Sequence, residues 1–281
     1  MREHFNSPAV QFALLAPGAF RIYCPAVNDT LIIIPTYDEK DNVRSIAEAV
    51  FKVNPATDIL FVDDNSPDGT GRIVDAMCAA DRRVNVLHKE GKSGLGRAYI
   101  SGFKWAIQRP YQFVFEMDAD FSHDPREIPN FLKAAADADL VIGSRYVEGV
   151  RITNWPLRRL FLSKGAATYV RLITGMPVTD PTGGYKCYRR EVLTAIDLDA
   201  IVSNGYSFQV EMTHTAWSKG FRIVEIPITF VDRRAGRSKM SSDITREAMR
   251  IVWTLALRNS FRRSPAQHRT GQPREGETEA R

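Results

Sequence analysis

The sequence predicts an α/β fold in which a mostly parallel sheet is flanked by helices on both faces. One observation is a set of short, almost continuously apolar runs, which are typical of strands buried on both sides. Another is that segments with helical periodicity separate the runs, as residues 43–51 separate the runs at 31–35 and 59–62. Acidic turns follow these runs, and in such sheets ligands bind beyond the carboxyl ends of the strands.

The alternation is regular in the first half of the chain. Strands are expected in TLIIIPTYDE, DILFVDD, VNVLHK and FVFEMDAD, with helices in DNVRSIAEAVFKV, residues 71–80 and AYISGFKWAIQ between them. The acidic turns at Asp63–Asp64 and Asp118–Asp120 each follow a strand. Because parallel strands end at the same edge of a sheet, we expect these turns to converge on one site.

The second half of the chain is less regular. We expect strands in ADLVIGSRY and FRIVEIPITFVDRR, a glycine turn leading to a strand and a helix in DPTGGYKCYRREVL, and helices at residues 154–175, 208–220 and 242–261. The expected organisation is a disordered extension at residues 1–29, one domain over 30–240, an amphipathic basic helix over 241–263 and a disordered tail at 264–281.

The composition is that of a soluble globular protein, with 44% hydrophobic and 25% charged residues. No stretch approaches the ~20 apolar residues needed to cross a bilayer. Cys24, Cys78 and Cys187 have no metal-ligand spacing, which favours reduced thiols in a cytoplasmic protein. The net charge of +5 is concentrated toward the C-terminus, where it suits nucleic acid or membrane phosphate. The basic segment at 230–240 lacks interleaved aromatic residues, so we expect no nucleic-acid partner.

The strongest chemical signal is the pair Asp118 and Asp120 at the end of a predicted strand. Two carboxylates about 4 Å apart repel by roughly 4 kcal/mol at an effective dielectric of 20, so a compensating cation is expected. Mg²⁺ and Mn²⁺ take oxygen ligands and leave coordination positions for substrate phosphates. The alternative is an acidic loop in which Asp124 caps a helix starting at Pro125, which explains Asp124 but not the pair.

The segment VDDNSPDGT reads as a turn, but beside a diphosphate site Asp64 is suited to hydrogen-bond a nucleobase or ribose. The same pocket would be walled by Pro35, Tyr37 and Glu39. The glycine segment EGKSGLGRA matches neither the P-loop nor the dinucleotide pattern, and a flexible loop is the simpler interpretation. Its Lys92 is a candidate phosphate ligand.

Two basic segments add candidate anion ligands. FVDRRAGRSKM carries three arginines and a lysine, which suit a diphosphate leaving group, although a solvated basic loop is also credible. Arg159 and Ser163 lie four residues apart on one face of a predicted helix that is also rich in apolar residues. That helix suits anionic lipid headgroups, the alternative being an exposed helix with ordinary charges. His123 and His214 lack partners at metal spacing and are expected to be structural.

A set of motifs resembles a known family. They are PTYDEKDN, VDDNSPDGT, GLGRAYISGF, MDADFSHDP, IGSRY, DPTGGYKCYRREVL, GYSFQVEM and FVDRRAGRSK, in this order. Together they resemble the polyprenyl- or dolichyl-phosphate mannosyltransferases, within the inverting glycosyltransferases of family 2 and GT-A fold. The resemblance covers residues 31–240.

The resemblance implies transfer of mannose from GDP-mannose to a polyprenyl phosphate with inversion, in a GT-A (Rossmann-like) catalytic domain that uses Mg²⁺ or Mn²⁺. The residues that it implies for guanosine are Pro35, Tyr37, Glu39, Val62 and Asp64. Those for metal and diphosphate are Asp118, Ala119, Asp120 and Ser122, the serine as a further metal ligand. Those for the donor or acceptor phosphates are Arg145, Arg233 and Lys239, with Arg159 and Ser163 for the acceptor phosphate. The catalytic candidates are Asp118, Asp120 and Arg145.

The resemblance also implies peripheral attachment to the inner face of the membrane, or attachment through a membrane-anchoring partner subunit. Two alternatives stay open. One is the same reaction class with another donor or acceptor, such as UDP-glucose and polyprenyl phosphate, or a polysaccharide acceptor. The other is a non-catalytic, membrane-associated subunit that binds a nucleotide sugar.

Overall fold

The computed structural model describes residues 28–153, 156–231 and 249–257. The predictions for the N-terminal extension up to residue 27, for Arg233 and Lys239, and for the tail at 264–281 lie outside these residues. Within them, residues 249–257 are helical, as predicted for the last helix, whose remaining residues are not described.

The predicted α/β architecture is confirmed by a seven-stranded sheet with the order β3-β2-β1-β4-β7-β5-β8. Its strands are β1 (Thr30–Thr36), β2 (Thr57–Asp63), β3 (Val84–His88), β4 (Phe113–Glu116), β5 (Leu140–Ser144), β7 (Lys186–Arg189) and β8 (Ile223–Pro227). β7 runs antiparallel to β4 and β5, and the other neighbours in the sheet are parallel. All strands except β7 therefore end at one edge, which we call the carboxyl edge.

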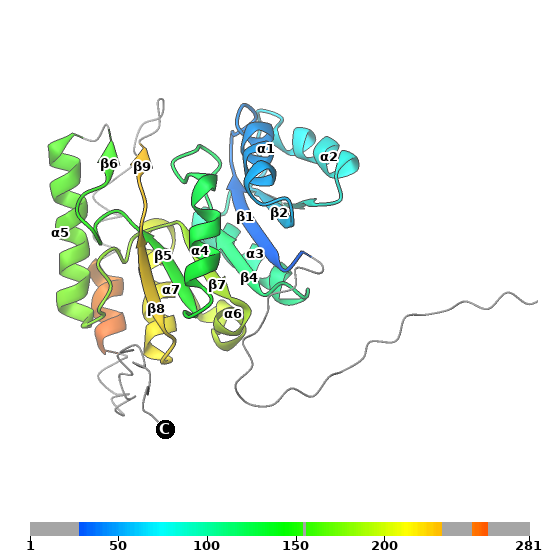
Figure 1. The fold of residues 1–281 in the computed structure, drawn as a ribbon. Coiled ribbons are helices and arrows are strands. Elements are labelled where there is room, and N and C mark those ends of the chain that lie inside the picture. Colours follow the sequence, from blue (N-terminus) through cyan, green and yellow to red (C-terminus); the bar gives the residue numbers. More distant parts are fainter. Residues whose placement is uncertain (1–27, 154–155, 232–248, 258–281) are drawn as a thin grey trace, which may run out of the picture.

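Helices cover both faces of this sheet (Figure 1). They are α1 (Val43–Val53), α2 (Thr70–Ala80), α3 (Leu95–Ile107), α4 (Ile128–Ala134), α5 (Leu157–Thr174), α6 (Arg190–Ala195) and α7 (Gly205–Ser218). Buried side chains of α1, α2 and α4 pack on one face of the sheet, and those of α3, α6, α7 and residues 249–257 pack on the other.

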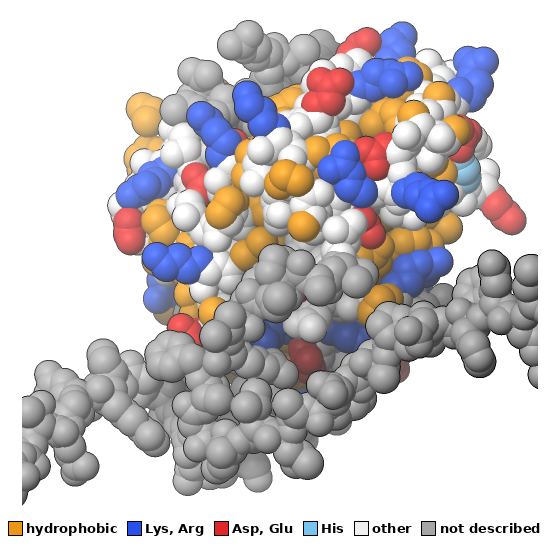
Figure 2. Space-filling model, turned by 45° about the vertical axis from the view of Figure 1, so that its right-hand side comes forward, with side chains coloured by type: hydrophobic (Ala, Val, Ile, Leu, Met, Phe, Trp, Pro, Cys, Tyr) orange, Lys and Arg blue, Asp and Glu red, His pale blue; other side chains and the backbone are white. Residues whose placement is uncertain are grey.

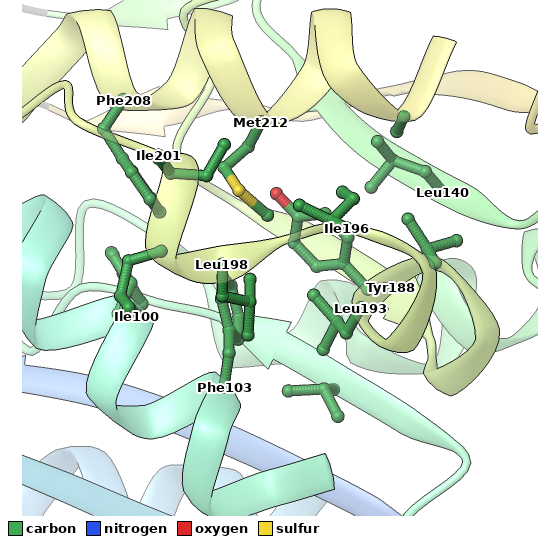
Figure 3. Close-up of a cluster of buried hydrophobic side chains, with 14 of the residues drawn as sticks. Ile100, Phe103, Leu140, Tyr188, Leu193, Ile196, Leu198, Ile201, Phe208 and Met212 are labelled. Carbon is green, nitrogen blue, oxygen red and sulfur yellow. The ribbon is translucent and has the colours of Figure 1, made fainter. Parts of the chain in front are cut away.

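The alternation of side chains along the strands explains why whole strands are apolar. In β1, Leu31 and Ile33 face the cluster under α3 and α7, whereas Ile32 and Ile34 face the cluster under α1 and α4. Figure 3 shows the first cluster, where side chains of α3, α6 and α7 meet around Tyr188 of β7. With both faces covered, the central residues of β1 are all apolar, and its two threonines stand at the ends of the strand.

A second, two-stranded parallel sheet pairs β6 (Ile152–Thr153) with β9 (Phe230–Val231). It lies beside the upper part of α5 in Figure 1. The structure thus divides the single strand predicted over 221–234 into β8 and β9. β8 ends at Pro227, and the next amide, Ile228 N, still bonds to Ser144 O of β5 at 3.0 Å before the chain reaches β9.

On the face shown in Figure 2, Lys and Arg side chains are interspersed with Asp and Glu side chains and with apolar ones. They do not form a single basic stripe on this face. Within the described ranges, none of the helices has the length and apolar character that a bilayer-crossing segment requires.

Candidate active site

The turns after β1, β2 and β4 share an uncommon backbone feature at the carboxyl edge. Asp38, Asn65 and Phe121 are described residues other than glycine with positive φ, at 61°, 60° and 62°. Each follows the end of one of three adjacent strands. Left-handed backbone at non-glycine residues is costly and collects at functional sites, so this edge is the best candidate for the active site.

The loop after β4 contains the predicted Asp-x-Asp pair. Asp118 keeps a 29% exposed side chain, and its backbone N–H donates to His123 Nδ1 at 3.0 Å. Asp120 accepts a hydrogen bond from Ser122 N at 3.0 Å through Oδ1. Ala119 between them is buried, so its side chain packs into the protein. The two aspartates lie at the carboxyl edge.

The donor atoms in this loop fit a hard divalent cation. The Ser122 hydroxyl is buried and has no hydrogen-bond partner among the described residues, which is the state expected of an oxygen that completes its shell with a ligand. In the described ranges, no three His, Cys, Asp or Glu side chains gather as a closed metal site. An oxygen-only set with few protein ligands is what Mg²⁺ or Mn²⁺ uses when a substrate phosphate completes the coordination.

His123 stands directly behind this loop. It is buried, and its ring stacks on Tyr185 with centroids 4.9 Å apart and planes 16° apart. Burial lowers the pKa of His123, Asp118 opposes this effect, and Arg145 reinforces it. Because Nδ1 accepts the hydrogen bond from Asp118 N, this nitrogen carries no proton.

A buried polar network lies under the loop, between β4, β7 and α7. Glu116 of β4 accepts from Tyr188 Oη at 2.9 Å and from Gln209 Nε2 at 2.6 Å. Lys186, the cross-strand partner of Glu116, donates to Gln209 Oε1 at 2.5 Å. Burial raises the pKa of Glu116 and lowers the pKa of Lys186 to about 8. Sequence analysis missed this network because its members come from three distant segments.

The loop after β3 is fastened to the turn after β2 through Asp64. The buried Asp64 carboxylate accepts hydrogen bonds from Ser93 N at 3.0 Å, Ser93 Oγ at 2.9 Å and Gly94 N at 2.8 Å. Asn204, the residue that caps the N-terminus of α7, joins the same loop by donating to Ser93 O at 3.2 Å. A Cβ at Gly94, where φ is +88°, would lie 2.6 Å from Asn204 Nδ2, so only glycine fits. The structure thus gives Asp64 a loop-organising role that the sequence did not suggest.

The other residues predicted for guanosine lie in β1, in β2 and in the turn after β1. Tyr37 is exposed, and Lys92 Nζ lies 3.5 Å from the centre of its ring, so the structure brings these two predicted residues together. Glu39 lies in the turn after β1, where its carboxylate accepts from Asn42 Nδ2 at 2.7 Å. Pro35 is near the end of β1. The Val62 side chain is fully buried under α3, which leaves only its backbone for a ligand.

On the opposite side of the edge, Arg145 follows β5 and is almost fully buried. Its guanidinium forms a two-pronged ion pair with Asp180, with Nε–Oδ2 and Nη2–Oδ1 distances of 2.7 Å each, and Nη2 also donates to Thr182 Oγ1 at 2.8 Å. Burial alone would raise the pKa of Asp180, but the ion pair with Arg145 lowers it below its usual value. Sequence analysis named Arg145 as a phosphate ligand and missed the carboxylate that accompanies it.

Of the predicted pair on α5, Ser163 contacts the residue that follows Arg145. Tyr146 donates to Ser163 Oγ at 2.8 Å, and the Tyr146 ring centre is 5.3 Å from the Arg145 guanidinium carbon. Arg159, one turn before Ser163, is half-buried. Phe230 of β9, whose ring centre is 5.7 Å from the same guanidinium carbon, precedes the segment that contains Arg233 and Lys239.

The outer face of α5 carries large exposed apolar side chains. Phe161 and Leu172 are 72% and 78% exposed, and at 100° per residue they lie on the same side of the helix as the exposed Leu157. Residues 249–257 show the same pattern, with Met249, Trp253 and Leu257 exposed at intervals of four. Both helices lie at one end of the molecule in Figure 1.

Comparison with protein families and curated proteins agrees with the family that the motifs indicate. The sequence model of glycosyl transferase family 2 matches residues 31–197. The chain is 50% identical over 237 residues to polyprenol monophosphomannose synthase of Mycolicibacterium smegmatis, covering 84% of this chain and 89% of that protein. It is also 50% identical over 230 residues to undecaprenyl-phosphate mannosyltransferase of Micrococcus luteus, covering 81% and 95%. These similarities confirm the resemblance inferred from the motifs.

Comparison with solved structures supports the GT-A-like fold. Glucosyl-3-phosphoglycerate synthase from Mycobacterium tuberculosis, solved with Mn²⁺, UDP and glucosyl-3-phosphoglycerate, matches with a TM-score of 0.60 at 16% identity, over 82% of this chain and 80% of that one. The mannosyltransferase PcManGT from Pyrobaculum calidifontis, in complex with GDP-Man and Mn²⁺, matches with a TM-score of 0.50 at 14% identity, over 84% and 72%. At such identities the likeness concerns the fold.

Proposed function

Because the chain belongs to glycosyl transferase family 2, we propose that it transfers mannose from GDP-mannose to a polyprenyl phosphate, with inversion at the anomeric carbon. The observation that carries this proposal is the 50% identity, over most of the chain, to two curated polyprenyl-type mannosyltransferases. The geometry supports it, because the Asp118 loop, the turns after β1 and β2, and Arg145 all belong to one edge of the sheet.

Asp118 and Asp120 would hold a divalent cation, Mg²⁺ or Mn²⁺, with Ser122 as a further oxygen donor. A bound cation would stabilise the negative charge that develops on the departing GDP. The turn after β1 and the loop fastened to Asp64 would hold the guanosine, with Tyr37 offering a ring face and Lys92 a cation near the phosphates.

The acceptor needs no strong general base, because a phosphate monoester has its second pKa near 6 and is mostly dianionic at neutral pH. Its binding site must instead provide positive charge and hydrogen-bond donors. We assign this role to Arg159 and Ser163 on α5, where Ser163 bonds to Tyr146, with Arg233 and Lys239 beyond β9. Arg145 is paired with Asp180, so it contributes fixed geometry and directed N–H groups more than net charge.

A lipid acceptor requires a membrane-facing surface, and the apolar outer face of α5 suits that purpose. Exposed leucine and phenylalanine side chains flanked by Arg158 and Lys164 match a helix that lies in the headgroup region of an anionic bilayer. Residues 249–257 would add Trp253 to this surface. The attachment is peripheral and on the cytoplasmic side, where nucleotide sugars are found, with or without a membrane-anchoring subunit.

The test is a competition between donors. The protein is incubated with undecaprenyl phosphate, Mn²⁺ and equal amounts of GDP-mannose and UDP-glucose that carry different isotope labels, and the extracted lipid is analysed by mass spectrometry. A hexosyl-phosphoryl lipid with the mannose label is expected. A lipid that carries the glucose label would show that UDP-glucose, and not GDP-mannose, is the donor. Nucleotide-sugar binding without turnover would indicate the non-catalytic alternative.

A further inference from the structure

We propose that His123 is a positioning residue for Asp118: it fixes the backbone of this metal-binding residue through one ring nitrogen and turns its other ring nitrogen toward the carboxylate. The inference rests on the proposed metal site at Asp118 and Asp120. It differs from the sequence-based expectation, in which His123 had only a structural role.

The ring of His123 is fixed in place. Only 2% of the residue is exposed, and aromatic rings contact it from two directions. The Tyr185 ring stacks on it, and the Phe230 ring meets it nearly edge-on with centroids 6.1 Å apart and planes 70° apart. Gly184 borders the ring on a further side, since a Cβ there would be in ordinary van der Waals contact with His123 Cε1, at 3.4 Å.

The orientation of the ring assigns a role to each nitrogen. His123 Nδ1 accepts the hydrogen bond from Asp118 N at 3.0 Å, so in the neutral ring the proton resides on Nε2. That Nε2 lies 4.0 Å from Asp118 Oδ2. A small rotation of the carboxylate brings the two atoms into hydrogen-bond distance, which would select one orientation of Asp118 for a cation.

The packing around His123 also connects the loop to the acceptor side. Tyr185, which stacks on His123, donates a hydrogen bond to Asp124 O at 3.3 Å, at the far end of the same loop. Phe230 contacts the His123 ring and lies near the Arg145 guanidinium. One stack of rings therefore fixes the position of the loop between Asp118 and Asp124 relative to Arg145.

His214 shows what a buried histidine without such a role looks like. It is buried in α7, meets Trp217 nearly edge-on with centroids 5.6 Å apart, and its Nε2 has no hydrogen-bond partner in the described part of the chain. Both histidines are buried next to aromatic rings, but only His123 bonds to the Asp118 loop. His214 is therefore a matched control.

The experiment measures Mn²⁺ binding to the full chain in the presence of GDP, by the loss of the free Mn²⁺ EPR signal, together with Tm. His123→Phe keeps a ring against Tyr185 but removes both nitrogens, and His123→Asn keeps an acceptor near Asp118 N but removes the ring. The Phe variant is expected to bind Mn²⁺ about tenfold more weakly or worse, as for other residues that orient metal ligands. The Asn variant is expected to stay closer to wild type, and His214→Phe to bind as wild type does.

Wild-type affinity in His123→Phe, or an equal loss in His214→Phe, would overturn the inference. If the Phe variant does not fold, His123→Asn is compared with His123→Ala, and Mn²⁺ binding by the Asn variant no tighter than that by the Ala variant would overturn it. Wild-type protein that binds no Mn²⁺ would overturn the proposed metal site itself, and this inference with it. The two failures are therefore distinguishable.

Discussion

The two sides of the carboxyl edge are organised in different ways. On the side that we propose for the nucleotide sugar, called the donor side, which comprises the turns after β1–β3, the buried carboxylate of Asp64 is satisfied by N–H and O–H groups of a neighbouring loop. On the side that we propose for the lipid phosphate, called the acceptor side, which comprises residues 144–182 and β9, the buried carboxylate of Asp180 is satisfied by the charged Arg145. Hydrogen bonds from neutral donors shape the donor side, and a buried charge pair shapes the acceptor side.

This difference indicates which side of the edge loses more stability when its buried carboxylate is substituted. Neutral partners tolerate the loss of one hydrogen bond, at a cost of about 1–3 kcal/mol for a group left unsatisfied. A buried ion pair that loses one partner leaves an uncompensated charge, which costs about 3–5 kcal/mol. The acceptor side should therefore respond more strongly to substitution of its carboxylate.

The largest effect is expected for Asp180→Asn. It leaves the buried Arg145 without its counter-charge and should lower the free energy of unfolding by about 3–5 kcal/mol in chemical denaturation. Asp64→Asn on the donor side is the matched control and should cost clearly less. Equal losses in the two variants would contradict the distinction between the two sides.

The same ion pair predicts a pH dependence. The pKa of Asp180 is lowered in the folded protein, so its contribution to stability is complete above the unfolded value of about 3.9 and is lost as the pH falls through the lower folded value. Below about pH 4, wild type should therefore lose more unfolding free energy than Asp180→Asn. Parallel pH curves for the two proteins would show that the pair is not formed in solution.

A loss of activity is expected for Asp118→Asn, which weakens the site that stabilises the leaving GDP. Removing one such electrostatic contribution costs about 10²–10³-fold in kcat. Tm should change little, because the Asp118 side chain is partly exposed. Asp137→Asn, at an exposed aspartate beyond α4, is the control. Near-normal, metal-dependent turnover by the Asp118 variant would remove this loop from the mechanism.

The sequence was most informative where a function depends on consecutive residues. Asp118, Asp120 and Ser122 belong to one short motif after an apolar strand, and the Asp124 cap was also predicted: its carboxylate accepts from Arg126 N at the start of the next helical turn. The mostly parallel sheet followed from the alternation of apolar runs and helical segments. The antiparallel β7 did not, because a short strand shows no direction in its residue pattern.

What could not be predicted depends on contacts between distant segments. Asp180 is 35 residues from Arg145, and Asn204 is 111 residues from Ser93, so no local pattern joins either pair. The hydrogen bond of His123 was missed for a related reason. Its partner is a backbone amide five residues away, and metal-ligand spacing does not report such a bond.

A moderate effect is expected at the outer face of α5. Replacing Phe161 with Ser removes an exposed aromatic side chain whose burial in a lipid interface is worth about 1.5–3 kcal/mol, which corresponds to roughly 10–100-fold in vesicle partitioning. Co-sedimentation with anionic vesicles measures it. Val150→Ser, at an exposed apolar residue outside α5, should bind as wild type does. If Phe161→Ser also binds normally, α5 is not the membrane-facing surface.

The smallest effect is expected for Tyr146→Phe, which removes the hydrogen bond to Ser163 but keeps the ring beside Arg145. One such bond contributes about 0.5–1.5 kcal/mol, so KM for polyprenyl phosphate should rise by a factor of about 2–10 while KM for GDP-mannose stays constant. A change in KM for GDP-mannose alone would show that Ser163 contributes to binding of the sugar donor and not of the lipid phosphate.

The most direct test of the account is the anomeric configuration of the lipid product. The protein is incubated with ¹³C-labelled GDP-mannose, Mn²⁺ and undecaprenyl phosphate, and the one-bond C–H coupling at the anomeric carbon of the extracted lipid is read by NMR. Direct displacement by a lipid phosphate on the far side of the sugar predicts a β-linked mannosyl-phosphoryl lipid. An α-linked lipid, or mannose recovered only in water, would contradict the account.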